Sequence, residues 1–207
     1  MLRADLHIHT RFSADASPDP SGLVERCVKT GLNCIAVTDH NTLQGALEVQ
    51  RIVLRLSKDI APFRVIIGEE IGTTGGDIIG LFLTAEIPKG LAPLEAVQRV
   101  KAQGGLVSVP HPFDRFRSSA IHQQALDEIL PYVDIIEAFN SHTPLMRDNR
   151  KAQELAKARG LLVCVGSDAH DVREVGRTYV EMPEFDGTAS GFKQALAQAR
   201  LVTRRAS

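Results

Sequence analysis

Short apolar runs alternate along the chain with segments of helical periodicity. The apolar runs predict strands at residues 4–9, 33–40, 63–73, 77–83, 106–112, 133–140, 161–170 and 177–183. Helical periodicity and end signals predict helices at residues 17–31, 42–56, 92–105, 125–133, 147–160 and 190–200. The turn TTGGD separates the third strand from the fourth. This regular alternation indicates a parallel α/β protein, built either as an open sheet or as a barrel.

The size and charge of the chain limit the classes of function. Its 207 residues fit one domain that can bury a proper core. A net charge of -1, from 24 basic and 25 acidic residues, gives no electrostatic reason to expect duplex nucleic acid or an anionic membrane as a partner. The sequence has neither an apolar run near the ~20 residues of a membrane span nor a signal-peptide pattern. Cys27, Cys34 and Cys164 form no Cys-x-x-Cys pair, so we expect reduced, packed thiols in a cytoplasmic protein.

Polar side chains follow the predicted strands at the points where the strands end. They are His7, His9, Asp39, His40, Glu69, Glu70, His111, Asn140, Asp168 and His170. In parallel α/β folds the carboxyl ends of the strands gather on one face, where active sites form. His7 and His9 are two residues apart on a strand and point to the same side, and Asp168 and His170 repeat that spacing. Histidine and carboxylate donors without cysteine suit Zn, Mn or Fe, so we predict a metal cluster on this face.

The number of donors indicates more than one ion. A single metal needs about four to six ligands, fewer than these histidines and carboxylates supply. Two or three divalent ions, bridged by carboxylates, use the set better and suit the activation of water against a phosphoryl group. Each motif alone has a simpler interpretation, such as a helix cap or a solvated edge. To exclude a metal site, however, all of these simpler interpretations would have to be correct at the same time. His122 is expected at the surface, whereas a site role for His142 stays open.

The chain resembles the PHP (polymerase and histidinol phosphatase) superfamily of metal-dependent phosphoesterases in five ordered motifs. Between residues 5 and 170 these are DLHIHTRFSADAS, GLNCIAVTDHNT, GEEIGT, VPHPFD and GSDAH. The resemblance implies a distorted (β/α)7 barrel, a single PHP domain over residues 1–207, with the metals at the carboxyl ends of the strands. It implies metal ligands at His7, His9, Asp15, His40, Glu70, His111, Asp168 and His170. It also implies that Glu70 bridges metals and that Asp39 supports His40. Many members carry a histidine where this chain has Asp77, whose shorter reach leaves a third metal open.

The resemblance also implies hydrolysis of a small phosphate monoester or nucleotide by a metal-activated water. Asp168 and His170 would act through that water. Because the forked guanidinium of arginine suits phosphate, the candidates for substrate binding are Arg11, Arg117 and Arg177, together with Asn140. We favour Arg117, which follows a ligand strand in a polar loop.

Other functions stay open at this point. An exonuclease-type phosphodiesterase is one, although the neutral charge and short length favour a small substrate. A metal-dependent amidohydrolase is another, although no lysine stands at a strand end as a bridging-ligand candidate. A non-catalytic metal-binding domain is a third, which the nearly complete ligand set disfavours. His142 and Asp39 are both candidates for the general acid, and neither the substrate nor the oligomeric state is indicated.

Overall fold

The computed structural model describes residues 1–203, so residues 204–207 of the predicted domain lie outside it. Its strands form one sheet in the order β7-β6-β5-β4-β3-β2-β1-β8-β9. The strands are β1 (Leu2–Ile8), β2 (Cys34–Val37), β3 (Arg64–Thr73), β4 (Gly76–Leu81), β5 (Leu106–Val109), β6 (Ile135–Asn140), β7 (Leu162–Gly166), β8 (Tyr179–Met182) and β9 (Arg200–Val202). The α-helices are α1 (Pro20–Thr30), α2 (Gln44–Leu56), α3 (Pro93–Ala102), α4 (Gln123–Ile129), α5 (Met146–Arg159) and α6 (Ala189–Leu196). Two 3-10 helices are η1 (Leu130–Tyr132) and η2 (Val172–Glu174).

The sheet curls until the segment after β7 meets β1. There the Asp168 amide donates to the His7 carbonyl at 2.8 Å, and the His9 amide donates to the Ala169 carbonyl at 3.1 Å. Ile8 and Ala169 form a parallel bridge. The first residues of β1, by contrast, pair with β8. The result is a nearly closed, distorted α/β barrel, which confirms the predicted fold class.

The strand directions differ in part from a purely parallel alternation. Neighbouring strands run parallel within β1–β2–β3 and within β5–β6–β7. However, β4 is antiparallel to β3 and β5, and β8 is antiparallel to β1 and β9. The reason at β4 is the short turn between Thr73 and Gly76, which makes a hairpin with no crossover helix. The first residues of β4 therefore lie beside the carboxyl end of β3. The closing helix also ends earlier than predicted, at Leu196, and Arg200–Val202 form the additional strand β9.

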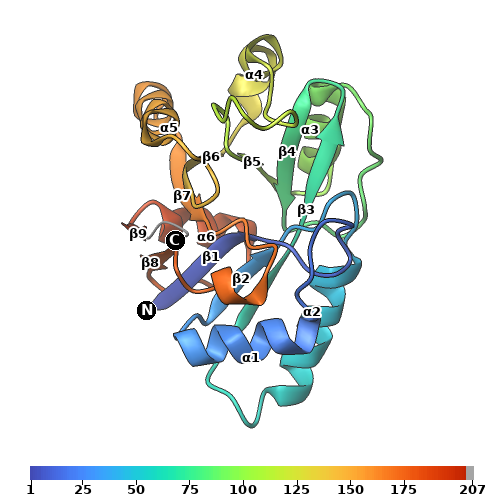
Figure 1. Ribbon diagram of the computed structural model, residues 1–207, viewed down its shortest axis with the longest axis vertical. Coiled ribbons are helices and arrows are strands. Elements are labelled where there is room, and N and C mark those ends of the chain that lie inside the picture. The colour runs from blue at the N-terminus through green and yellow to red at the C-terminus, as the bar shows by residue number, and fades with distance from the viewer. Residues whose placement is uncertain (204–207) are drawn as a thin grey trace.

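Five of the helices cover the outside of the barrel in two groups, as Figure 1 shows, with α1 and α2 at one end and α3, α4 and α5 at the other, whereas α6 lies beside β7. Leu23 and Val49, from the first pair, pack against β1 and β2. Val97 and Leu126, from the second group, pack against β4–β6. Helix α1 illustrates the local signals, because Asp19 caps its start and Gly31 ends it in the left-handed conformation at φ 78°.

The three cysteines lie in the interior of the fold. They are Cys27, Cys34 and Cys164, and all three are free thiols. Within residues 1–203, no helix combines the length and the apolar character that a membrane span requires.

Candidate metal centre

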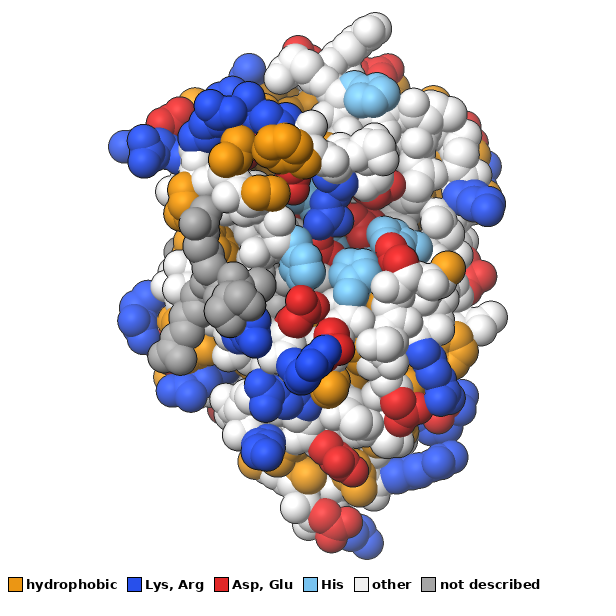
Figure 2. All heavy atoms as spheres, in the orientation of Figure 1, with side chains coloured by type: hydrophobic (Ala, Val, Ile, Leu, Met, Phe, Trp, Pro, Cys, Tyr) orange, Lys and Arg blue, Asp and Glu red, His pale blue; other side chains and the backbone are white. Residues whose placement is uncertain are grey.

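Histidine and carboxylate side chains meet at the carboxyl ends of the strands. Figure 2 shows them gathered in a hollow near the middle of one face, with basic side chains above it. The strand ends supply the residues as follows: His7 from β1 and His9 directly after it, His40 after β2, Glu70 from β3, Asp77 from the start of β4, His111 after β5, and Asp168 and His170 after β7. Most of the residues that the sequence places on this face are therefore brought together, whereas Glu69 lies outside the donor groups and accepts from the Ile87 amide.

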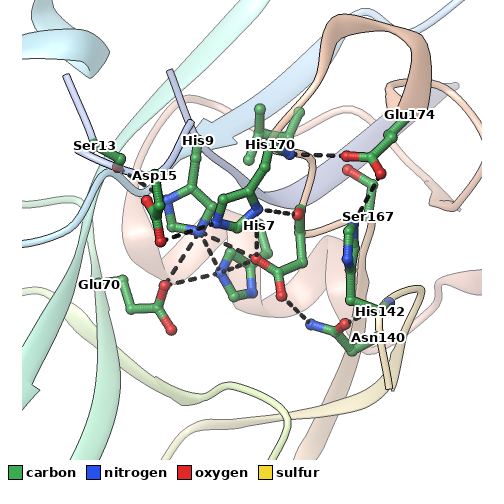
Figure 3. A network of polar contacts seen from close by, with 12 residues as sticks. His7, His9, Ser13, Asp15, Glu70, Asn140, His142, Ser167, His170 and Glu174 are labelled. Carbon is green, nitrogen blue, oxygen red and sulfur yellow. Dashed lines mark hydrogen bonds and ion pairs between the residues drawn. The ribbon is translucent and has the colours of Figure 1, made fainter. Parts of the chain in front are cut away.

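The centre of the cluster consists of four buried donor atoms. His7 Nε2 and His9 Nε2 are 3.1 Å apart. Glu70 Oε2 lies 3.2 Å from each of these nitrogens. Asp168 Oδ1 lies 3.3 Å from the His7 nitrogen and 3.2 Å from the His9 nitrogen. Figure 3 shows the side chains of His7, His9 and Glu70 pointing toward one another. Nitrogen and oxygen donors that converge in this way, with water excluded, fit a metal ion.

The cluster extends into four overlapping groups, in each of which the ligand atoms lie within 4.8 Å of one another. Among the described residues the groups are His7–His9–Asp168, His7–Glu70–His111, His40–Glu70–Asp77 and His9–His40–His170. Each group shares one residue with the next, and the last shares His9 with the first. The groups therefore form one connected site rather than separate ones.

Glu137 orients the first histidine of the site. Its Oε1 lies 3.0 Å from His7 Nδ1, while its Oε2 accepts the His111 amide at 2.7 Å and the Asn140 Nδ2 at 2.9 Å. A carboxylate accepts, so Nδ1 of His7 carries a proton and Nε2 faces the cluster, where its lone pair would serve a bound ion. Glu137 was missed in the sequence, where the signal was a single charged residue within the apolar run IIEAFN.

Ser13 orients the ring of His9, as Glu137 orients that of His7. Its hydroxyl has one proton, which it donates to Asp39 Oδ1 at 2.9 Å. The 3.2 Å contact between His9 Nδ1 and Ser13 Oγ therefore has the histidine as donor, and His9 Nε2 is left to face the cluster. Asp39 also accepts from the Thr10 amide and hydroxyl, at 2.6 and 2.7 Å. Asp39 thus holds the turn that positions Ser13, and nothing in the sequence marked that serine.

Two residues of the site have an unusual backbone. His111 has φ 30° and Asp168 has φ 53°, in the left-handed region that side chains with a Cβ rarely adopt. Such strain persists only where the surroundings enforce it, and it clusters at functional sites. Here the amide of His111 is held by Glu137 and that of Asp168 by the His7 carbonyl.

The electrostatics keep both central carboxylates ionised. Burial alone would raise the pKa of Glu70, but His7, His111 and His9 around it hold that pKa well below its usual value. Burial would also raise the pKa of Asp168, but the positive charges and hydrogen bonds of His7, His9 and Arg117 outweigh burial and hold that pKa well below its usual value. In turn, burial would lower the pKa of His9, but Asp168 and Glu70 raise it to about 9. Without an ion, protons on the histidines balance the carboxylates, and a divalent ion would replace them.

The remaining predicted ligands lie at the edge of the cluster. Asp15 belongs to none of the four groups and is exposed, but its Oδ2 lies 3.4 Å from His40 Nε2 and 3.5 Å from His170 Nε2. Asp77, the residue that replaces a common histidine, is buried within the group of His40 and Glu70. It reaches them because the antiparallel β4 starts at this end of the barrel.

The predicted substrate-binding residues separate into different environments. Arg117 is 22% exposed, and its Nη2 donates to Asp168 Oδ2 at 2.5 Å, at the edge of the cluster. Arg11 pairs instead with Asp19 on the surface at 2.6 Å. Arg177 is half-buried in the segment after η2.

The other polar candidates lie around the same edge. Asn140 is buried and donates to Glu137 and, at 3.2 Å, to Asp168 Oδ2, so its amide orients ligand side chains. His142 is half-buried beside the cluster, with its Nε2 3.2 Å from Glu174 Oε1. His122 is exposed at the start of α4.

The family pattern of the PHP domain matches residues 5–159. The chain belongs to the PHP family. A second pattern, described as PHP-associated, matches residues 146–201. The prediction that residues 1–207 form a single PHP domain stays a prediction.

Two uncharacterised proteins of Methanocaldococcus jannaschii are each 38% identical to this PHP chain. One matches over 189 residues, which is 89% of this chain and 72% of the relative, and the other over 149 residues, 67% of this chain and 84% of the relative.

Solved structures agree on the fold of the PHP chain. A two-domain protein from Bacteroides vulgatus, containing a predicted PHP-like metal-dependent phosphoesterase, superposes with a TM-score of 0.76 at 18% identity. The match covers 98% of this chain but only 65% of that protein. An amidohydrolase from Chromobacterium violaceum, solved with bound sulfate and no metal, gives a TM-score of 0.68 at 16% identity, over 96% of this chain and 97% of the other.

Proposed function

We propose that this PHP chain is a metal-dependent phosphoesterase that hydrolyses a small phosphate ester, either a monoester or a nucleotide. The observation that carries the proposal is the connected set of four donor groups with Arg117 at its edge. Membership in the PHP family supports a metal-dependent hydrolase. The phosphoesterase named within the similar Bacteroides vulgatus protein supports the choice of phosphate esters.

The donor set fits two or three divalent ions of the Zn, Mn or Fe type. His7 and His9 each have one ring nitrogen committed to a neighbouring oxygen, at Glu137 and at Ser13, so each can serve one ion. Because His7 and His9 each belong to two of the four groups, the groups cannot all hold an ion at once, and the site holds fewer than four ions. Glu70 is suited to bridge, because its Oε1 lies 3.1 Å from His111 Nε2 while its Oε2 faces His7 and His9. Divalent ions in such a set supply Lewis acidity, which activates water and neutralises charge on a phosphoryl group.

The side chains of the protein would orient the ester around this centre. Asp168 is fixed by Asn140 and Arg117 at one oxygen, so its other oxygen keeps a constant direction toward His7 and His9. Arg117 is partly exposed beside it and has further N–H groups to donate to phosphate oxygens. Those donors would hold the phosphoryl group in place while negative charge moves to the leaving oxygen.

Amide hydrolysis is the second candidate, because a similar solved structure is named as an amidohydrolase. The two functions differ in the bond that is broken, and a substrate panel separates them. The panel should contain sugar phosphates, nucleotides, a phosphodiester, amides and lactones, assayed with protein loaded with Mn, Zn or Fe. We expect release of phosphate that stops on chelation and returns when the metal is restored. Turnover of amides or lactones with no phosphate ester hydrolysed would overturn the proposal.

A further inference from the structure

A pocket opens directly beside the candidate metal centre. It has a volume of about 910 Å³, and the segments that follow β1, β2 and β4 line it. The segment after β4 runs back along β3 to this face, where its Gly90 amide donates to the Gly72 carbonyl at 2.7 Å. The lining residues are Phe12, Ala14 and Asp15 after β1, His40, Asn41, Thr42 and Gln44 between the end of β2 and the start of α2, and Glu86–Lys89 after β4. Because His40 and Asp15 also border the metal cluster, the pocket lies directly against the cluster. That volume lies at the upper end of the range for ligand sites and exceeds what a bare phosphate needs.

Hydrogen bonds hold the walls of the pocket in place. Glu86 Oε1 accepts from the Thr42 hydroxyl at 2.7 Å and from the Leu43 amide at 2.9 Å. The buried Glu69 accepts from the Ile87 amide at 3.0 Å. These bonds join the loop after β4 to the start of α2 and to β3. The pocket is therefore formed before any ligand enters, which reduces the entropic cost of binding.

Asn41 presents a fixed donor to this pocket. It has φ 57°, a left-handed conformation that asparagine tolerates better than most residues. The backbone amide of Asn41 donates to the Glu70 carbonyl at 2.9 Å, and the side-chain Oδ1 accepts from the backbone amide of Gly72 at 2.8 Å. Within the described part of the chain, no hydrogen bond from the Asn41 Nδ2 is found. The side chain is thus oriented by its oxygen, and its N–H groups are available to a ligand.

Two further side chains give the pocket its chemical character. The Arg11 guanidinium lies 5.8 Å from the centre of the Phe12 ring, so this arginine covers part of the ring, which also lines the pocket. Such a ring offers apolar contact to the face of a sugar or a base. Lys89 is exposed on the loop after β4 and brings a positive charge.

We infer that this pocket binds the alcohol part of the phosphate ester, and that Asn41, Phe12 and Lys89 determine specificity. The inference rests on the proposed function. Arg117 and Asp168, which would hold the phosphoryl group, do not line the pocket, whereas His40 belongs both to the cluster and to the pocket wall. A phosphoryl group at the cluster would therefore extend its alcohol past His40 into the pocket. The substrate class is a phosphate ester whose alcohol is a hydroxylated group of sugar or nucleoside size, with acceptors for Asn41 and Lys89.

The first test compares kcat/KM for large and compact esters. The substrates are glucose 6-phosphate, adenosine 5′-monophosphate and ethyl phosphate, assayed with the metal-loaded full chain. We expect the wild-type protein to have a higher kcat/KM for glucose 6-phosphate or adenosine 5′-monophosphate than for ethyl phosphate. Which of the two large esters is preferred shows whether the pocket takes a sugar or a nucleoside. Asn41→Asp keeps the oxygen that accepts from Gly72 but removes the donor, so the large-to-compact ratio should fall about three- to tenfold. Lys89→Met should lower it as well.

The matched control is Lys151→Ala, an exposed lysine on α5 outside the pocket, which should keep the wild-type ratio. No preference in wild type, or an unchanged ratio in both pocket variants, would overturn the inference.

A second test does not depend on turnover. The side-chain amide signal of Asn41 in a ¹⁵N–¹H NMR spectrum, assigned by its loss in Asn41→Asp, should shift when glucose or adenosine is added. If the signal does not respond to either alcohol, the pocket is not their binding site. If it shifts while wild type hydrolyses no phosphate ester, the proposed function fails and the pocket assignment stands.

Discussion

Glu137 Oε1 lies 3.0 Å from His7 Nδ1 and so joins the middle of β6 to the first ligand strand. The same carboxylate holds the His111 amide, so one buried side chain orients two candidate ligands. Partners of this kind fix the tautomer and the ring orientation of a ligating histidine, and their loss weakens metal binding.

The first prediction concerns this carboxylate. Glu137→Gln keeps the size of the side chain but replaces one accepting oxygen with an amide group, which cannot accept both the His7 and the His111 protons. We expect metal affinity to fall about 10- to 100-fold. Competition with a fluorescent chelator measures it, and circular dichroism checks that the fold is kept. Wild-type affinity in this variant would show that Glu137 does not orient the ligands.

A glycine makes the contact between Glu137 and His7 sterically feasible. A Cβ added at Gly166 would lie 2.1 Å from Glu137 Oε1 and 2.5 Å from His7 Cβ. We expect Gly166→Ala to lower the free energy of unfolding by about 1–3 kcal/mol and to weaken metal binding. Gly22→Ala in α1 is the matched control, because nothing lies within 4 Å of its added Cβ. That variant should be as stable as wild type or more stable by about 0.4–1 kcal/mol. Equal urea denaturation curves for the two variants would contradict the steric argument.

The positions of the candidate ligands could be predicted because they depend on simple rules. Residues two apart on a strand share a side, and parallel strands end on one face, so His7 and His9 were expected to meet His40 and His170. The place of Asp77 depends on β4 running antiparallel, which puts the start of that strand at the same face.

The contact between Glu137 and Asn140 could not be predicted in this way. Residues three apart on a regular strand face opposite sides. In β6, however, Glu137 pairs with Cys164 and Phe139 pairs with Val165, so Ala138 is an extra residue in a bulge. The bulge brings Glu137 and Asn140 to the same side, where they bond to each other. No residue pattern in the sequence marks such a bulge.

The third prediction concerns Arg117. Its guanidinium contacts Asp168 and is partly exposed, so it can donate to a phosphate while a lysine cannot match its forked geometry. We expect Arg117→Lys to lower kcat/KM for phosphate esters about 10- to 100-fold with metal content unchanged. Arg99→Ala, on the exposed face of α3, is the control and should match wild type. If Arg117→Lys retains full activity, the arginine does not bind the phosphoryl group.

The fourth prediction concerns pH. In the metal-free protein, burial lowers the pKa of His9, but Asp168 and Glu70 raise it to about 9, above the value of about 6.5 in an unfolded chain. A raised histidine pKa stabilises the fold fully below pH ~6.5, and this contribution is lost as the pH rises through about 9. Burial raises the pKa of Asp5 and of Glu69 only to about 7, so their effects are largely complete by pH ~8.

The free energy of unfolding of the metal-free protein should therefore fall by about 2 kcal/mol or more between pH 7.5 and 9.5. Urea denaturation at a series of pH values measures the fall. Metal-loaded protein should lack it, because an ion takes the place of the protons. A parallel decline in metal-free and metal-loaded protein would show that the histidines do not hold the ion.

The most direct measurement of the central claim is the fate of oxygen from water during turnover. Metal-loaded protein is incubated with a hydrolysed phosphate ester in H₂¹⁸O, and both products are analysed by mass spectrometry. Attack of water on phosphorus predicts one ¹⁸O atom in the inorganic phosphate and none in the alcohol, with turnover abolished in Asp168→Asn. Label in the alcohol, or no release of phosphate from any ester by the metal-loaded protein, would contradict the account.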